Sequence, residues 1–249
     1  DKAGYDQVLQ AMTGICALQG SPEAPEIVYG SVVDYYAAAL LAGGVSSALY
    51  QRERTGKGSA VNISLLRSAL AMQSARLVWA EGEAREVYRD MRSGGITGLH
   101  PTGEGHLYIS ANTPHFWRAL CHKIDRPALA TDARYDTVRK RAQHQSALLP
   151  ILHQALQART AREWEAVFGE EVPCAAARSV EDMFDEPQVL AQGMVARFTH
   201  PTVGDFRGFK EPVRFSRTPG PEPFAAPTLG QHSAAVRAEV ARLDDTARR

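Results

Sequence analysis

The stretch that decides the fold runs VDYYAAALLAGGVSSALYQRERTGKG over residues 33–58. Its middle is rich in alanine and leucine, which favour a helix. It ends in Arg52, Arg54 and then Gly56, a pattern typical of a last helical turn and its left-handed cap. We therefore predict a long helix from Tyr35 to about Arg54, whose small residues would let neighbouring backbone come close.

Asp34 stands immediately before this helix and is the only formally charged residue between Ile27 and Gln51. Its side chain could accept hydrogen bonds from free backbone N–H groups, as an N-cap residue does. The positive end of the helix dipole also favours an ionised carboxylate, the form in which an aspartate acts as a nucleophile. Spacing alone leaves both interpretations open, and aspartate N-caps are common.

The same stretch is long enough to raise the question of a membrane. A transmembrane helix needs roughly 20 consecutive, mostly apolar residues. Here the apolar run is interrupted by Asp34, two tyrosines and two serines. We therefore predict a buried helix of a protein that has no membrane partner.

Hydrophobic patterns on either side of this helix predict an α/β chain, and breaks near residues 85 and 200 divide it into three parts. Residues 1–84 form a helical segment that carries Asp34, residues 85–200 a small α+β domain, and residues 201–249 a returning tail with a proline-rich coil. The predicted helices cover residues 5–19, 35–54, 65–83, 114–124, 139–157, 160–168 and 180–190, and the predicted strands cover 60–64, 106–110, 194–199 and 213–215.

The bulk composition is typical of a globular protein and argues against nucleic-acid binding. Of 249 residues, 44% are hydrophobic and 22% charged, which is typical of a globular protein. Lys plus Arg (28) equal Asp plus Glu (28), so no net charge draws the chain to nucleic acid. We predict no nucleic-acid partner.

The cysteines and histidines do not form a metal-binding pattern. Cys16, Cys121 and Cys174 are odd in number and far apart, which favours a reducing compartment. His115 and His122 lie seven residues apart on a predicted helix, but no third ligand stands beside them. We therefore predict no metal site.

A set of short motifs resembles the class III CoA-transferases. Val33 and Asp34 are followed, eighteen residues after the aspartate, by RERTGKG at 52–58 and then by VNISLL at 61–66. Further runs are similar to the landmarks of that family and occur in its order: AGYDQ at 3–7, VPC at 172–174, EPQ at 186–188, HPTVG at 200–204, PVRFS at 212–216 and APTLG at 226–230. The resemblance extends from about Gly4 to His232.

The resemblance implies the class III CoA-transferase fold and a reaction that moves CoA between an acyl-CoA thioester and a carboxylic acid. Asp34 matches the catalytic aspartate, on which an aspartyl-CoA thioester would form. The run 93–98 resembles the glycine loop of the family, so Gly94, Gly95 and Gly98 are expected to cover the active site. Without the resemblance, the same run would also fit a flexible surface turn. A CoA thioester is implied as substrate, with no permanently bound cofactor.

The resemblance also implies partners. Full-length members begin with a Rossmann-like half that contacts CoA, and two of their chains interlock. This chain resembles the rear portion, so we expect a homodimer or an assembly with a chain that supplies the missing half, in the cytoplasm. Racemase relatives carry histidine where this chain has Tyr5, which favours transfer over racemisation, although His100 could serve as another base. An acyl-CoA racemase or isomerase of the same fold, and a non-catalytic partner subunit or fragment, remain alternatives.

Overall fold

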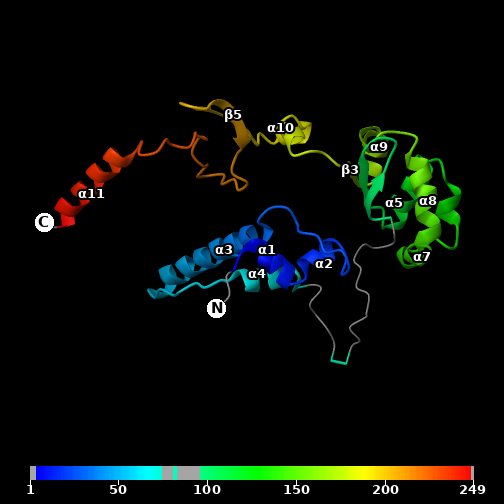
Figure 1. Cartoon of the computed structure of the whole chain (residues 1–249), viewed down its shortest axis with the longest axis horizontal. Helices are drawn as coiled ribbons and strands as arrows, with labels where there is room; N and C mark the ends of the chain where they lie inside the picture. The colour runs from blue at the N-terminus through cyan, green and yellow to red at the C-terminus, as the bar shows by residue number, and fades with distance from the viewer. Residues whose placement is uncertain (1–3, 75–80, 83–95, 248–249) are drawn as a thin grey trace. The chain divides into compact units, whose positions relative to one another are not determined.

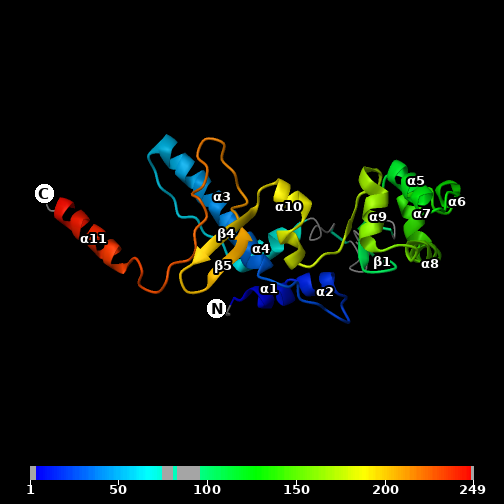
Figure 2. The ribbon, with the colours of Figure 1, turned by 90° about the horizontal axis from the view of Figure 1, so that it is seen from above.

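The computed structural model of the chain describes residues 4–74, 81–82 and 96–247. It divides into two compact units, residues 1–91 and residues 92–249. Figures 1 and 2 show the elements of each unit, and each unit is described by itself below.

The first unit is helical throughout its regular elements. It contains α1 (Asp6–Met12), α2 (Ile15–Gln19), α3 (Val32–Thr55) and α4 (Leu65–Met72). The helix predicted over residues 5–19 is broken between α1 and α2, where Gly14 has a positive φ of 87°. The predicted strand at 60–64 is wrong, because this segment has no ladder partner in the described part of the chain and runs as coil into α4.

The long predicted helix is confirmed, and its two ends differ in how well the sequence locates them. Gly56 caps α3 with a φ of 68°, and its N–H bonds the carbonyl of Arg52, as the local pattern predicted. The helix begins at Val32, three residues before the predicted start, with Ser31 at the N-cap position. Asp34 is therefore the third residue of the first turn, so the interpretation of Asp34 as the N-cap is wrong.

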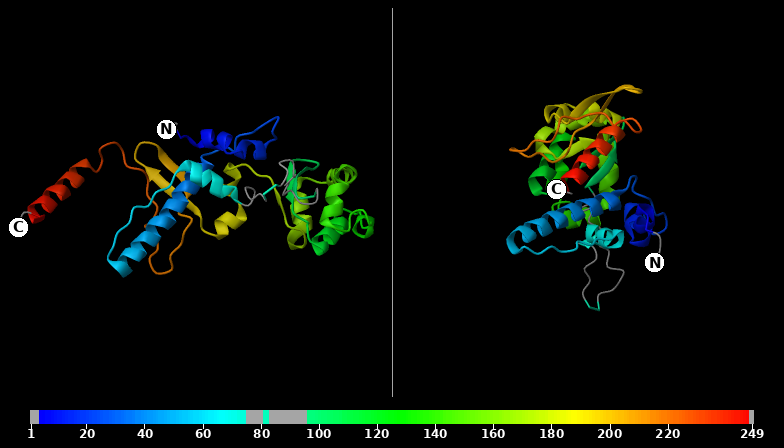
Figure 3. Two further views of the ribbon diagram at one scale, coloured as in Figure 1. Left: turned by 90° about the horizontal axis from the view of Figure 1, so that it is seen from below. Right: turned by 90° about the vertical axis from the view of Figure 1, so that its left-hand side faces the viewer.

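A small apolar cluster holds the helices of the first unit together. The helices α1, α3 and α4 contact one another, and Figure 3 shows their ribbons close together. Its buried members are Leu9, Ile15, Val33 and Ala69. Only Val33 and Ala37 of α3 are buried, so the prediction of a buried helix is wrong for this chain. By length and composition α3 could also cross a bilayer, but core helices of soluble proteins pass the same test.

The second unit begins with a three-stranded antiparallel sheet. Its strands are β1 (Gly98–Pro101), β2 (His106–Ile109) and β3 (Cys174–Ala176), in the order β1-β2-β3. Of these strands only β2 was predicted. The strand β1 has the same length as β2 but begins with glycine and ends with proline, two residues that are depleted in strands, and β3 has only three residues. Helices follow between β2 and β3: α5 (Pro114–Lys123), α6 (Ala128–Thr131), α7 (Val138–Gln143), α8 (Gln145–Leu156) and α9 (Ala161–Phe168), then the 3₁₀ helix η3 (Gly169–Glu171).

These helices and the sheet enclose the main core of the chain. Among its fully buried members are Leu107, Leu120, Leu152 and Phe168. The helix α9 packs on β2 and β3, while α8 packs on β1. A capping box starts α9, in which Thr160 and Glu163 bond each other's backbone N–H groups, as the motif predicts. The single helix predicted over 139–157 is divided into α7 and α8 at His144.

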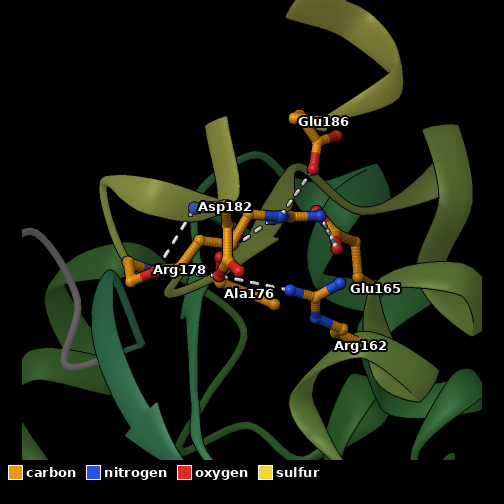
Figure 4. A network of polar contacts seen from close by, with 7 residues as sticks. Arg162, Glu165, Ala176, Arg178, Asp182 and Glu186 are labelled. Carbon is orange, nitrogen blue, oxygen red and sulfur yellow. Dashed lines mark hydrogen bonds and ion pairs between the residues drawn. The ribbon is translucent and has the colours of Figure 1, made fainter. Parts of the chain in front are cut away.

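An ionic network ties the end of the sheet to the next segment (Figure 4). Arg178, just after β3, pairs with Glu165 of α9 at 2.7 Å and with Glu186 at 2.9 Å. Its side chain is 17% exposed, so these pairs are partly shielded from solvent. The network fixes the start of α10 (Pro187–Ala191), which follows the 3₁₀ helix η4 (Glu181–Phe184).

A two-stranded hairpin and a last helix complete the chain. The strand β4 (Val195–His200) pairs with β5 (Gly204–Phe209), and Figure 2 shows the two side by side. The predicted strand at 213–215 is wrong, because β4 pairs with β5, the segment that begins at Gly204 and contains Gly208. The helix α11 (Ser233–Ala247) was not predicted.

Candidate active site

The carboxylate of Asp34 lies at the start of α3, exposed to solvent. Its backbone N–H is bonded, but within the described residues its side chain has no hydrogen-bond or ionic partner. A carboxylate without partners keeps its oxygen lone pairs available, which is what a nucleophile requires.

A second carboxylate, missed by the sequence analysis, lies directly behind the start of this helix. Asp6, the first residue of α1, is only 3% exposed. Its Oδ2 accepts the backbone N–H of Val33 at 2.6 Å and the backbone N–H of Asp34 at 3.1 Å. Asp6 therefore caps the helix from a distant part of the chain: it lies 27 residues before Val33 and 28 residues before Asp34.

The other oxygen of Asp6 is held by a fully buried amide. Gln10, one turn further along α1, donates from Nε2 to Asp6 Oδ1 at 2.5 Å. Gln10 in turn accepts the N–H of Val28 at 3.0 Å and donates to the carbonyl of Val28 at 3.2 Å. This chain of bonds joins α1, the segment before α3 and the first turn of α3. Gln10 and Asp6 are spaced i and i+4 on one helical face, a signal that sequence reasoning could have noticed.

Tyr5, the residue at the position where racemase relatives carry histidine, immediately precedes Asp6. It is the N-cap residue of α1 in an extended conformation, and it is 71% exposed. The chain therefore places a phenol, rather than an imidazole, next to the buried carboxylate that supports Asp34.

The expected glycine loop lies mostly outside the described residues, since Gly94 and Gly95 do so and Gly98 alone is described. Gly98 starts β1 with a φ of 148°. Just before it, Ile96 is fully buried in the core of the second unit, and Thr97 Oγ1 donates to Asn112 Oδ1 at 2.9 Å. Residues 96–98 are thus anchored to the small domain.

The candidate second base, His100, is inaccessible. It is 3% exposed, its Nε2 lies 3.1 Å from the carbonyl of Ile96, and its Nδ1 lies 3.1 Å from Nε2 of His153. Because the carbonyl can only accept, Nε2 of His100 carries the proton and Nδ1 accepts from His153. Burial lowers the pKa of His100 below its usual 6.5. Both ring nitrogens are engaged, so His100 cannot act as a base toward a substrate in this arrangement.

The remaining reactive side chains have ordinary structural surroundings. Burial raises the pKa of Cys121 to about 12 and that of Cys174 to about 11, so both stay protonated thiols near neutral pH. His115 contacts Thr113 and the ring of Phe116 on the surface of α5. Over residues 4–74, 81–82 and 96–247, no three His, Cys, Asp or Glu side chains group in a way that could hold a metal ion.

Comparisons with known proteins connect this chain to one family. Residues 1–233 match the sequence profile of CoA-transferase family III. A succinyl-CoA:glutarate CoA-transferase of Mus musculus is 31% identical over 251 residues, which cover 99% of this chain and 58% of the relative. An acetyl-CoA:oxalate CoA-transferase of Acetobacter aceti is 31% identical over 252 residues, covering 95% of this chain and 61% of the relative.

The structural comparison agrees with the sequence comparison. The crystal structure of a CaiB/BaiF family protein from Brucella suis superposes with a TM-score of 0.76 at 26% identity, over 96% of this chain and 63% of that protein. The mixed helical and sheet fold expected from the motifs is therefore confirmed. The chain spans about three-fifths of the length of these relatives.

Proposed function

Because this chain belongs to CoA-transferase family III, we propose that it carries the catalytic aspartate of a CoA-transferase and that this residue is Asp34. The observation that carries the proposal is the exposed carboxylate of Asp34, without a partner among the described residues, on a helix start where Asp6 already accepts the N–H groups of Val33 and Asp34. The relatives are named as CoA-transferases, which favours transfer over racemisation. The phenol of Tyr5 supports the same choice.

The proposed reaction proceeds through covalent intermediates on Asp34 and regenerates the free carboxylate at the end of each cycle. The carboxylate attacks the carbonyl of the acyl-CoA and displaces the CoA thiolate. The acyl group is then joined to Asp34 as a mixed anhydride. The thiolate then attacks the Asp34 carbonyl, which releases the donor acid and leaves an aspartyl-CoA thioester. The acceptor carboxylate repeats these two steps in reverse order, so that the product acyl-CoA forms and Asp34 is free again. No metal or redox step is needed for this balance.

We propose a small dicarboxylic acid as the acceptor, since glutarate and oxalate are the acids in the names of the two relatives. Gly94, Gly95 and Gly98 keep their proposed role as the loop that shields the intermediates from water. We place the protein in the cytoplasm, as the three separate cysteines without a disulfide pattern suggest.

The intact enzyme requires more surface than this chain provides. Tyr35 and Tyr50 on α3 are 70% and 65% exposed, and about two-fifths of the length of the relatives lies outside the part that this chain matches. We propose that α3 is covered in the active assembly by a further polypeptide region that binds CoA, in a homodimer or with a separate chain.

Mass spectrometry of the chain incubated with succinyl-CoA tests the proposal. We expect a CoA adduct that hydroxylamine converts to a hydroxamate at Asp34, because a thioester at that carboxylate reacts with the amine. Asp34→Asn should abolish the adduct, since the amide is not a nucleophile of this kind.

Glu53→Gln, which changes an exposed carboxylate on the same helix, should leave the adduct intact. An adduct on another residue would contradict the assignment of Asp34. No adduct and no CoA binding by the chain alone would favour the alternative of a partner subunit or fragment.

A further inference from the structure

The first turn of α3 has an unusual cap. Helix starts leave backbone N–H groups without partners, and the N-cap side chain normally accepts one of them. Here Ser31 holds the N-cap position but its side chain makes no capping bond. The N–H groups of Val33 and Asp34 are taken instead by Asp6 of another helix.

Without Asp6, the N–H groups of Val33 and Asp34 would lose the carboxylate that accepts them, and the helix start would be more attractive to the carboxylate of Asp34. An acidic residue three positions after the N-cap can fold back on the helix start, where in a capping box it accepts the backbone N–H of the N-cap residue, here Ser31. A carboxylate held in this way donates electron density to N–H groups and is a poorer nucleophile. Asp6 already occupies the N–H of Asp34, and its buried charge offsets the positive end of the helix dipole.

The orientation of Asp6 is itself fixed. Gln10 donates to Oδ1, so only Oδ2 faces α3, and Gln10 is held by both polar groups of Val28. The side chains of Asp6 and Gln10 are 3% and 0% exposed, which removes water as a competing partner. The pair therefore presents one acceptor to α3 in one geometry.

We propose that Asp6 is a positioning residue that keeps the Asp34 carboxylate unpaired and exposed, with Gln10 as its orienting partner. The catalytic consequence rests on the proposed function of Asp34, whereas the effect on the Asp34 carboxylate does not. The two can therefore be tested apart.

The test measures how fast a water-soluble carbodiimide and an amine label Asp34 in the folded chain, relative to Glu53 on the same helix. In Asp6→Ala we expect labelling of Asp34 to slow about fivefold while that of Glu53 is unchanged, the size expected for one new hydrogen bond to the carboxylate. Ser31→Ala is the matched control and should leave both rates unchanged, because Ser31 makes no capping bond.

Two further measurements keep the proposal open to contradiction if Asp6→Ala does not fold. Asp6→Asn preserves the shape of the side chain and should slow labelling in the same direction by a smaller factor. In the unaltered chain, hydrogen exchange at the amides of Val33 and Asp34 should be slower than at the exposed, unbonded amide of Gly58. Equal labelling rates in a folded Asp6 variant, or fast exchange at both amides, would overturn the proposal.

The labelling experiment tests the role of Asp6 separately from the proposed transferase activity. If labelling behaves as expected and no aspartyl-CoA adduct forms, the positioning role holds and the transferase proposal fails for the chain alone. Where transfer is measurable, Asp6→Asn should lower kcat with little change in KM for the thioester, whereas damage to binding would raise KM.

Discussion

Two aspartates that meet at the start of α3 have opposite surroundings. Asp6 is buried and its two oxygens accept three hydrogen bonds, while Asp34 is exposed and its side chain has no partner among the described residues. Two carboxylates in one place commonly take different roles when their surroundings differ in this way. The arrangement gives Asp6 a structural role and supports the proposed catalytic role of Asp34.

A further prediction concerns the pH dependence of the small domain. The pKa of His100 is lowered by burial, so its unfolded form binds a proton at a higher pH than its folded form. The stability that depends on neutral His100 is full above the usual pKa of 6.5 and is lost as the pH falls from there toward the folded value. We expect the free energy of unfolding to decrease as the pH is lowered from about 8 to about 5.

Urea unfolding followed by the fluorescence of Trp117 and Trp164 measures this change. His100→Gln should flatten the decrease, because the titrating group is gone. His122→Gln, which removes an exposed histidine of the same domain, should leave the decrease unaltered. An unchanged slope in His100→Gln would mean that other groups cause the acid sensitivity.

At the scale of elements, α3 depends on close contact at one glycine and not at its neighbour. A Cβ added at Gly44 would lie 3.0 Å from Cγ1 of Val61, whereas a Cβ at Gly43 would meet nothing within 4 Å. Both glycines lie in the helix interior, where alanine is more favourable by roughly 1 kcal/mol. Of these two glycines, Gly44 is therefore the one that permits close approach of a neighbouring segment.

We expect Gly43→Ala to raise the free energy of unfolding of the chain by up to about 1 kcal/mol. Gly44→Ala should gain clearly less, or lose stability, because its methyl group must displace Val61. Thermal and urea unfolding of the two variants side by side provide the measurement. Equal stabilisation by both changes would show that the segment after α3 moves aside freely.

At the scale of the whole molecule, the first unit leaves an apolar helix largely uncovered. Leu41, Val45 and Leu49 follow one another at helical spacing on α3 and are 37%, 41% and 46% exposed. Contiguous exposed apolar surface of this kind usually marks an interaction surface or promotes association. The second unit, in contrast, contains a core with many fully buried side chains.

We therefore expect the chain to self-associate as its concentration rises. Light scattering after size-exclusion chromatography should show a smaller increase in mean mass for the double variant Leu41→Gln, Val45→Gln. The control Leu99→Gln changes a side chain that is 62% exposed in the second unit and should behave like the unaltered chain. If the double variant associated equally, the α3 surface would not be responsible.

The sequence by itself determined the features that depend on neighbours along the chain. Gly56 ends α3 because a left-handed cap suits glycine, and the Thr160 and Glu163 pair starts α9 through bonds three residues apart. The ordered motifs also identified the family, because their residues and their order can be read directly along the chain.

Only the tertiary structure decided the features that depend on distant partners. The start of α3 lies at Val32 because Asp6 caps it from 27 residues away, and no local pattern reports that bond. The pairing of β4 with the glycine-containing β5 overrode the weak strand signal at 213–215. Burial also depended on the tertiary structure. His100 and Gln10 are buried while most of α3 is exposed, because burial is set by which surfaces meet in space.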